Sequence, residues 1–238
     1  IDYDPITQIF PERVISIVFK SSSLRFIIIK GKPETAFYWP SEEMIYEKNF
    51  SYYSFSRLIN FHKSGMQPVR LAWNYLLIDE AKSIRQKVEK KLICIHLKRV
   101  APFDIKEANA DIREWKVFLS NNNQRVSFII IGDDPLPQEI LEIENVLSAN
   151  GMSMNLALQL CLVNFSDGFI GMASGICNAA NFSKVPHVLF KHPEHHTDDM
   201  QRELGDSESF IFSTPKQLLL RKEGNAKRLQ EALTFIIN

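Results

Sequence analysis

From residue 91 onward, short apolar runs alternate with amphipathic segments, and this alternation constrains the fold more than any other feature of the sequence. The apolar runs are rich in β-branched residues, as strands are. The segments between them repeat their apolar residues every three or four positions, as helices do. Such an alternation predicts a parallel sheet with right-handed helical crossovers. We therefore expect an α/β domain over residues 91–238, with helices on both faces of the sheet.

The pattern places the individual elements. Strands are expected at 92–96, 126–131, 145–149 (a sheet edge), 168–171, 186–190 and 209–212. The run VSFIII at 126–131 is apolar on both faces, as in a covered parallel strand. Helices are expected at 137–144, behind an N-cap at Ser153 for a segment that carries Leu156, Leu160 and Val163, at 175–181, and through Ala226 to Ile236.

Two further helix starts are suggested by capping residues. Asp104 with Glu107 resembles a capping box for a helix whose apolar residues recur as far as Leu119. Thr214 followed by Pro215 fits an N-cap with proline at the first helical position.

Residues 1–77 are less regular and predict a smaller, abbreviated N-terminal α/β region. Runs at 14–19 and 25–29 are expected to be strands. Many aromatic residues lie between 31 and 76 at no regular spacing. They form either a small core under loops or a surface that meets a sugar or a partner. Residues 78–90 are expected to be a linker helix.

Composition excludes several classes of protein. The 28 basic and 28 acidic residues cancel, which argues against a nucleic-acid partner. The cysteines at 94, 161 and 177 lie in apolar runs and are expected to be reduced thiols rather than disulfides or zinc ligands. No apolar run reaches the ~18 residues that span a bilayer. With no visible signal peptide we expect a cytoplasmic protein, and peripheral membrane association stays open.

In an open parallel sheet, ligands bind at the carboxyl ends of the strands. Segment 167–175 follows this rule best, because it holds three of the nine glycines of the chain, at 168, 171 and 175. Small residues there would let the backbone approach a ligand, and the helix after them would offer N–H groups to a pyrophosphate or carboxylate. The alternative is a tight strand–helix turn without a ligand. The segment is neither a GxGxxG motif nor a P-loop.

Basic and acidic residues follow the first two strands of the domain. His96, Lys98 and Arg99 end the first, where an arginine could fork onto phosphate oxygens. The alternative is a solvated basic turn. Asp133 and Asp134 follow the second strand, and either accept a ribose hydroxyl or form an ordinary turn.

Four of the six histidines lie between His187 and His196. His192, His195, His196 and Glu194 would be the ligands if a metal bound, but their spacing in a loop matches no closed zinc set. We expect a polar loop near a ligand mouth instead, and no metal. His187 is expected to be packed within its strand. No Ser-His-Asp or Cys-His arrangement stands out.

Residues 91–196 resemble the nucleotide-sugar-binding half of GT-B glycosyltransferases. The segment from 145 to 190 is similar to the heptosyltransferase-like branch, in which an Asp-Ser-Gly turn and the helix after it hold the diphosphate of the donor. Ser174 and Gly175 match that turn, whereas Ala173 replaces the aspartate and Asn178 replaces a histidine of the motif.

The run from Cys94 to Arg99 is similar to a motif of the fucosyltransferase-like branch, His-x-Arg-Arg, whose basic residues bind the GDP diphosphate. Arg99 matches the second arginine and Lys98 replaces the first. The acidic residue that follows in the motif is absent unless Asp104 takes its place.

The resemblance implies a Rossmann-like donor domain, and metal-independent transfer of a sugar from a nucleotide-diphosphate sugar to a glycan or other hydroxyl acceptor, as in polysaccharide biosynthesis, with no cofactor. Two alternatives stay open. One is a sugar-nucleotide epimerase or hydrolase. The other is a non-catalytic binding or assembly protein, which Ala173 and the short N-terminal region favour. The candidate donor-binding residues are His96, Lys98, Arg99, Asp133, Gly171, Ser174, Gly175 and Asn178.

Overall fold

The computed structural model describes residue 59 and residues 62–65, 71–99 and 108–238. The expected strands at 14–19 and 25–29 and most of the N-terminal region lie outside these residues. In chain order the elements are α5 (Tyr75–Gln86), β1 (Lys91–His96), α6 (Ile112–Asn122), β2 (Val126–Ile130), α7 (Gln138–Leu141), β3 (Val146–Ser148), α8 (Leu156–Val163), β4 (Gly168–Met172), the 3₁₀ helix η1 (Gly175–Cys177), α9 (Asn178–Asn181), β5 (His187–Phe190), α10 (Thr197–Leu204), β6 (Gln217–Leu220) and α11 (Ala226–Ile237).

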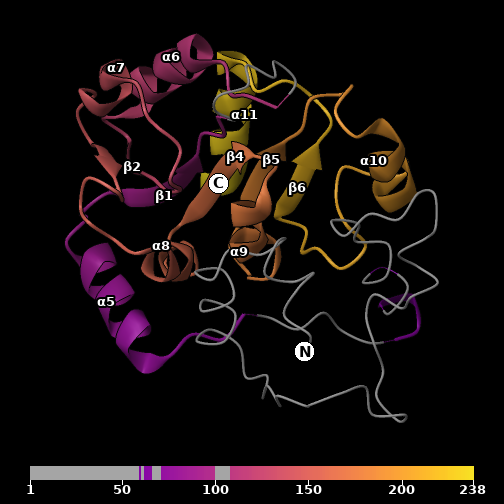
Figure 1. Cartoon of the computed structure of the whole chain (residues 1–238), viewed down its shortest axis with the longest axis horizontal. Helices are drawn as coiled ribbons and strands as arrows, with labels where there is room; N and C mark the ends of the chain where they lie inside the picture. Colours follow the sequence, from indigo (N-terminus) through magenta and orange to yellow (C-terminus); the bar gives the residue numbers. More distant parts are fainter. Residues whose placement is uncertain (1–58, 60–61, 66–70, 100–107) are drawn as a thin grey trace, which may run out of the picture.

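The six strands form one parallel sheet with the order β3-β2-β1-β4-β5-β6 (Figure 1). The chain runs outward from β1 to β3, returns to the centre at β4 and then builds the other half. The strand order therefore reverses between β1 and β4, where His96 is in register with Gly171. This is the α/β fold that the alternation of the sequence predicts.

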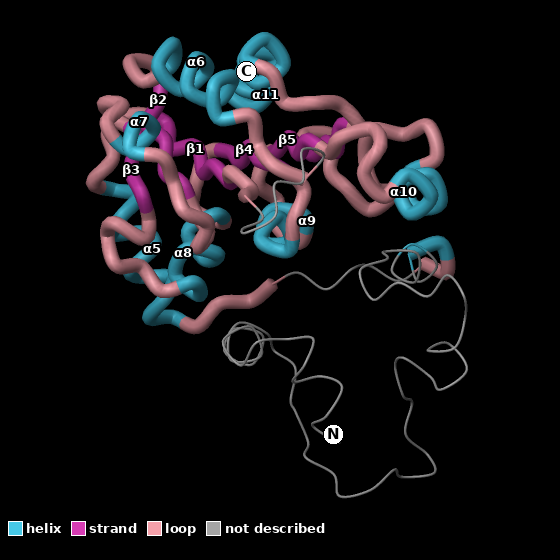
Figure 2. Tube along the Cα trace, turned by 45° about the horizontal axis from the view of Figure 1, so that its top comes forward, coloured by secondary structure: helices cyan, strands magenta, loops and turns pink. Residues whose placement is uncertain are grey.

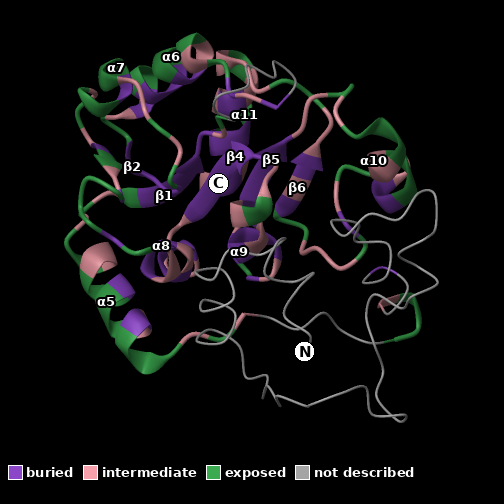
Figure 3. Cartoon of the chain, viewed as in Figure 1, coloured by how far each residue is buried: buried purple, intermediate pink, exposed green. Residues whose placement is uncertain are grey.

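Helices cover both faces of the sheet (Figure 2). On one face, α5, α8 and α9 pack over a core that includes Leu92, Cys94 and Phe169. On the other face, α6 and α11 pack over a core that includes Ile93, Phe128 and Val188. The central strands are buried along their length (Figure 3), which is why β2 and β4 are apolar at nearly every position.

The expected linker helix is α5, which begins at Tyr75 and ends at Gln86. Asn74 is its N-cap, and the side chain of Asn74 accepts a hydrogen bond from the Leu77 N–H at 3.0 Å. The three cysteines are buried and unpaired, as expected from their apolar surroundings.

The predicted capping box does not begin α6. The N-cap is Asp111, whose carboxylate accepts hydrogen bonds from two first-turn N–H groups at 3.0 and 3.4 Å. The Ala110 N–H donates to the Lys98 carbonyl at 2.9 Å, so the backbone just before the helix is tied to the end of β1. Asp104 and Glu107 lie outside the described residues.

The predicted cap of α8 is also wrong. Ser153 has a left-handed backbone, with φ of 56°, and its N–H closes a turn on the Asn150 carbonyl. An N-cap needs extended backbone. Asn155 meets this condition, and its side chain accepts a hydrogen bond from the Leu158 N–H at 2.9 Å.

The sixth strand is not at 209–212, and no helix begins at Thr214 and Pro215. The rings of Phe210 and Phe212 stack on each other, with centroids 5.2 Å apart, outside the sheet ladder. Phe210 and Phe212 are two residues apart, which is the spacing of side chains on one face of a strand, and the sequence pattern therefore predicted a strand here. Thr214 and Gln217 close a turn by two mutual hydrogen bonds, and β6 starts directly there.

Candidate functional site

The strand order reverses between β1 and β4, and open α/β sheets bind their ligands at the carboxyl edge beside such a reversal. The loops that follow β1, β2, β4 and β5 meet there. They carry Lys98, Asp134, Ser174 with Gly175, and Lys191 respectively. The strand ends thus bring together residues from four separate parts of the chain.

Two half-buried lysines, Lys98 and Lys191, lie at this edge, and their positive charges repel each other. Burial lowers the pKa of Lys98, and the Cys177 sulfur and the Asp134 carboxylate partly offset that effect. Burial also lowers the pKa of Lys191, the positive charge of Lys98 lowers it further, and acidic groups on α10 raise it. Within the described part of the chain, neither ammonium group has a carboxylate within 4.0 Å. Sequence reasoning missed Lys191, whose signal is a lysine directly after a buried apolar strand.

His96 lies beneath these lysines and is buried. Its Nδ1 is 3.2 Å from the Ile131 carbonyl oxygen. Because a carbonyl only accepts, Nδ1 carries the hydrogen and Nε2 of the neutral ring is an acceptor. Burial lowers the pKa of His96, which favours the neutral form of the ring. Two glycines make room for it: a Cβ at Gly132 would lie 3.0 Å from Nδ1, and one at Gly171 would lie 3.1 Å from the His96 Cβ.

The loop after β2 carries Asp134, whose charge reaches His96 and Lys98. The Asp134 carboxylate acts electrostatically on both His96 and Lys98, whereas Asp133 is exposed and shows no such effect on either group. The sequence shows two adjacent carboxylates after β2. Where each carboxylate lies depends on the backbone conformation of Gly132, which precedes them. Its φ of 109° is a conformation that favours glycine.

The turn after β4 is held by contacts among its own residues. The Cys177 thiol donates to the Met172 carbonyl at 3.0 Å, and the Ser174 hydroxyl is 3.6 Å from the same sulfur. Gly175 is exposed, and a Cβ there would meet nothing within 4 Å. The expected helix 175–181 consists of η1 and α9, two short pieces, so the positive charge at this edge comes mainly from the lysines.

The remaining candidates lie around this centre. Arg99 is exposed and is the last described residue of its segment. Asn178 begins α9, and its side-chain oxygen accepts a hydrogen bond from Asn181 at 3.3 Å.

The histidine-rich segment does not gather into a metal site. His192 bonds Glu223 at 3.0 Å, while His195 and His196 pack edge to face, with ring centroids 4.2 Å apart. The helix α10 follows directly after His196, in a stretch for which no element was predicted. Among the residues that the structure describes, no group of three or more His, Cys, Asp or Glu side chains is arranged to hold a metal ion. His187 is packed in β5, as expected.

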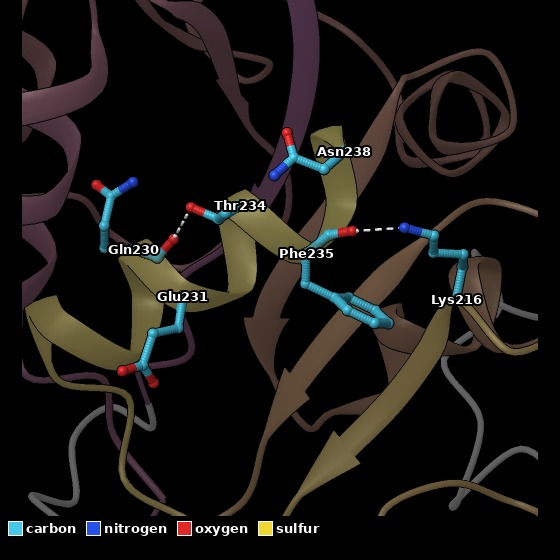
Figure 4. A pocket seen from close by; sticks show the side chains of 6 residues that line it. All are labelled: Lys216, Gln230, Glu231, Thr234, Phe235 and Asn238. Carbon is cyan, nitrogen blue, oxygen red and sulfur yellow. Dashed lines mark hydrogen bonds between the residues drawn. The ribbon is translucent and has the colours of Figure 1, made fainter.

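A surface hollow of about 470 Å³ lies at the opposite, amino edge of the sheet (Figure 4). Its lining comes from the C-terminal half of α11 and from Lys216, just before β6. Lys216 Nζ donates to the Phe235 carbonyl at 2.9 Å and lies 4.9 Å from the centre of the Phe235 ring. Lys91 Nζ donates to the Ile237 carbonyl at 2.8 Å, so both lysines cap the end of the helix.

No family model matches the chain, and no curated protein matches it in sequence. Solved structures do match in fold. The glycosyl transferase of family 9 from Veillonella parvula superposes with a TM-score of 0.51 at 12% identity, over 71% of this chain and 53% of that one. The KpsC beta Kdo 2,7 transferase of Thermosulfurimonas dismutans gives 0.33 at 12% identity, over 66% and 53%. The wall teichoic acid polymerase TagF gives 0.36 at 13% identity, over 66% and 41%.

The first of these likenesses shows the fold, and the other two are too distant to carry an argument. The chain thus shares its fold with a glycosyl transferase of family 9, in agreement with the fold that the resemblance in the sequence implies. It spans about half the length of that structure. No helix in the described ranges is long and apolar enough to cross a membrane.

Proposed function

We propose that this chain is part of a glycosyltransferase that binds a nucleotide-diphosphate sugar at the carboxyl edge between β1 and β4. The sugar passes to a hydroxyl group of a glycan or other acceptor. The chain spans about half the length of the family 9 glycosyl transferase from Veillonella parvula, so the acceptor side of the reaction is inferred from the scaffold and not from this site.

The observation that carries the proposal is the placement of two half-buried lysines at the carboxyl edge, Lys98 after β1 and Lys191 after β5, where the charge of Lys98 lowers the pKa of Lys191. Holding Lys98 and Lys191 together without a paired carboxylate costs free energy, because the charges repel and are partly desolvated. A bound anion removes that cost. A diphosphate carries enough negative charge to meet two ammonium groups at once, and the open turn at Gly175 leaves room for it.

The chemistry follows from the same charges. When a sugar leaves its nucleotide, negative charge develops on the departing diphosphate, and fixed cations in a partly dry site stabilise it. In this proposal Lys98 and Lys191 supply the positive charge that a metal ion supplies elsewhere. The Ser174 hydroxyl and the adjacent turn give polar contacts to the phosphates, and a carboxylate of the β2 loop accepts a ribose hydroxyl.

A second candidate is a binding protein of the same fold that does not catalyse transfer. Ala173 favours it, because the turn lacks the aspartate of the related motif and the Ala173 N–H is bonded to the Phe190 carbonyl at 2.8 Å. This candidate keeps the anion site and predicts nucleotide binding without turnover.

A thermal-shift panel tests the proposal. Purified protein is heated with GDP, UDP, ADP or CMP and with the corresponding nucleotide sugars, each with and without EDTA. A ligand at 100 times its Kd stabilises by ~2.7 kcal/mol, which raises Tm by several degrees. We expect one diphosphate to raise Tm equally in EDTA. If none does, the proposed donor site is wrong. Turnover of the matching nucleotide sugar separates the enzyme from the binding protein.

A further inference from the structure

A fully buried glutamine lies in the middle of α8, an otherwise apolar helix with the sequence LALQLCLV. Gln159 is 0% exposed, and its side-chain amide is saturated. Its oxygen accepts from the Gly132 N–H at 2.8 Å, and its nitrogen donates to the Asn150 side chain at 3.0 Å and to the Met154 carbonyl at 2.9 Å. Burying an amide costs more free energy than burying a leucine side chain, so we expect Gln159 to have a role beyond packing.

The amide network holds the peptide of Gly132 from both sides. Gln159 binds its N–H, and the Asn150 Nδ2 donates to its carbonyl at 2.8 Å. Gly132 adopts a φ of 109° and lies against the His96 ring. Side chains from α8 and from the turn after β3 thus fix Gly132, the second residue of the loop after β2.

Asp134 follows two residues later, and its negative charge raises the pKa of Lys98. The other groups that act on this ammonium, or on which it acts, are Cys177 of η1, His96 of β1 and Lys191 after β5. Asp134 is the one carboxylate among them. The position of the Asp134 carboxylate relative to Lys98 depends on the backbone of the β2 loop. Gln159 and Asn150 hold that backbone at Gly132.

We propose that Gln159 and Asn150 are positioning residues of the anion site, which hold the β2 loop so that the Asp134 carboxylate stays beside the Lys98 ammonium group. Their effect on Lys98 passes through Asp134 alone. The consequence for diphosphate binding rests on the proposed function, whereas the coupling between Gln159, Asp134 and Lys98 can be measured without any ligand.

The test is a double-mutant cycle read on the titration of Lys98. The ligand-free protein carries ¹³C-labelled lysine, and NMR follows the Lys98 side chain against pH in the parent, Asp134→Asn, Gln159→Met and the double variant. In the parent, Asp134→Asn lowers the Lys98 pKa, because a neighbouring negative charge is lost. In the Gln159→Met background we expect this lowering to fall to less than about half.

The cycle separates positioning from loss of stability. A general loosening of the fold changes the burial of Lys98 in both members of a pair and cancels in the difference. Equal lowering in the two backgrounds, or none in the parent, overturns the proposal. Leu162→Val, a buried change on the same helix outside the network, is the control and leaves the lowering as it is in the parent.

Asn150→Ala provides an independent route if Gln159→Met does not fold. Asn150 is exposed, so its loss spares the core while it frees the Gly132 carbonyl. The same reduction of the Asp134 effect is expected, and an unchanged effect in this variant contradicts the proposal.

Binding of inorganic pyrophosphate, measured by calorimetry, links the network to the site. The parent is expected to bind pyrophosphate more tightly than Gln159→Met by about threefold or more, with the difference growing as pH rises and Lys98 loses its proton. If the parent does not bind pyrophosphate at all, the proposed function fails while the titration cycle still decides the positioning role.

Discussion

Lys98 and Lys191 are the residues on which the account depends. Each is only half exposed, and the charge of Lys98 opposes that of Lys191. Proteins rarely hold like charges together in a partly dry place without a counterion, because both desolvation and repulsion raise the free energy of the charged forms. A ligand that brings two or more negative charges reverses both effects. The pair therefore predicts an anion more directly than any single motif in the sequence does.

Replacing Lys191 tests this at one residue. We expect Lys191→Met to weaken nucleoside-diphosphate binding by ~1.5–3 kcal/mol, the range of a charge-assisted hydrogen bond. Isothermal titration measures it. Lys184→Met, which removes an exposed lysine before β5, is the matched control and should bind as the parent does. Equal affinity in the Lys191 variant would remove this residue from the site.

His187 makes the stability of the fold depend on pH. Burial lowers its pKa to about 4, and a hydrogen bond to the Val185 carbonyl offsets this only in part. In the unfolded chain the ring titrates near 6.5. As pH falls, the unfolded state therefore binds the proton first, so the stability is complete above about pH 6.5 and is lost between about 6.5 and 4.

The expected size of this loss is about 2 kcal/mol between pH 7 and pH 5. Urea unfolding of the parent and of His187→Leu at the two pH values measures it, and the Leu variant should lose less stability on acidification by about that amount. His196→Asn, at an exposed histidine with left-handed backbone, is the control. The same acid sensitivity in parent and Leu variant would contradict a neutral, buried His187.

At the scale of elements, the close contact of β4 with α11 depends on a missing side chain. A Cβ on Gly168 would lie 2.2 Å from Cγ2 of Ile236, in the last turns of α11. We expect Gly168→Ala to lower the free energy of unfolding by ~1–3 kcal/mol through overpacking. Denaturant unfolding measures this. Combining it with Ile236→Ala should cost less than the sum of the two single changes, and simple additivity would argue against the clash.

In the turn between β4 and η1, a side chain in place of glycine is expected to leave the stability of the fold unchanged, unlike at Gly168. Gly175 is exposed, its φ is not left-handed, and a Cβ there meets nothing. Gly175→Val should therefore leave Tm nearly unchanged while it crowds the space above the turn and lowers diphosphate affinity by about tenfold or more. Thermal unfolding and calorimetry on one preparation check both halves. Unchanged affinity would mean that the turn lies away from the ligand.

Elements set by hydrophobic pattern were predictable, and those set by a single cap or by stacking were not. The strands at β1, β2, β4 and β5 carry apolar runs that only a covered sheet accommodates. The cap of α8 depends on whether Ser153 or Asn155 has extended backbone, which the sequence does not reveal. β6 was missed because two stacked phenylalanines before it imitated a strand.

The candidate site was predictable at its centre and not at its periphery. The loops after β1 and β4 follow from the rule that ligands bind at strand ends, so Lys98, Ser174 and Gly175 could be found from spacing. The same rule marks Lys191 after β5, but its interaction with Lys98 comes from burial and from the fold. Gln159 could not be found in this way, because its role comes from contacts between parts of the chain far apart in sequence. The lone glutamine in an apolar helix is the signal that would have marked it.

The whole molecule has two chemically different edges. The carboxyl edge carries the half-buried lysines and the open glycine turn at the reversal of strand order. At the amino edge, Lys91 and Lys216 are engaged by the carbonyls that end α11, beside the hollow of Figure 4. Lys98 and Lys191 are therefore at the edge where open parallel sheets bind ligands, and the hollow lies at the other edge.

The central claim is that the carboxyl edge holds a diphosphate through Lys98 and Lys191. Calorimetric titration of the full chain with a nucleoside diphosphate and with its monophosphate, both in EDTA, tests it most directly. We predict that one diphosphate binds at least about tenfold more tightly than its monophosphate, and that a variant with both lysines changed to methionine loses this preference. Equal affinity for the two nucleotides, or a preference that survives in the double variant, would contradict the claim.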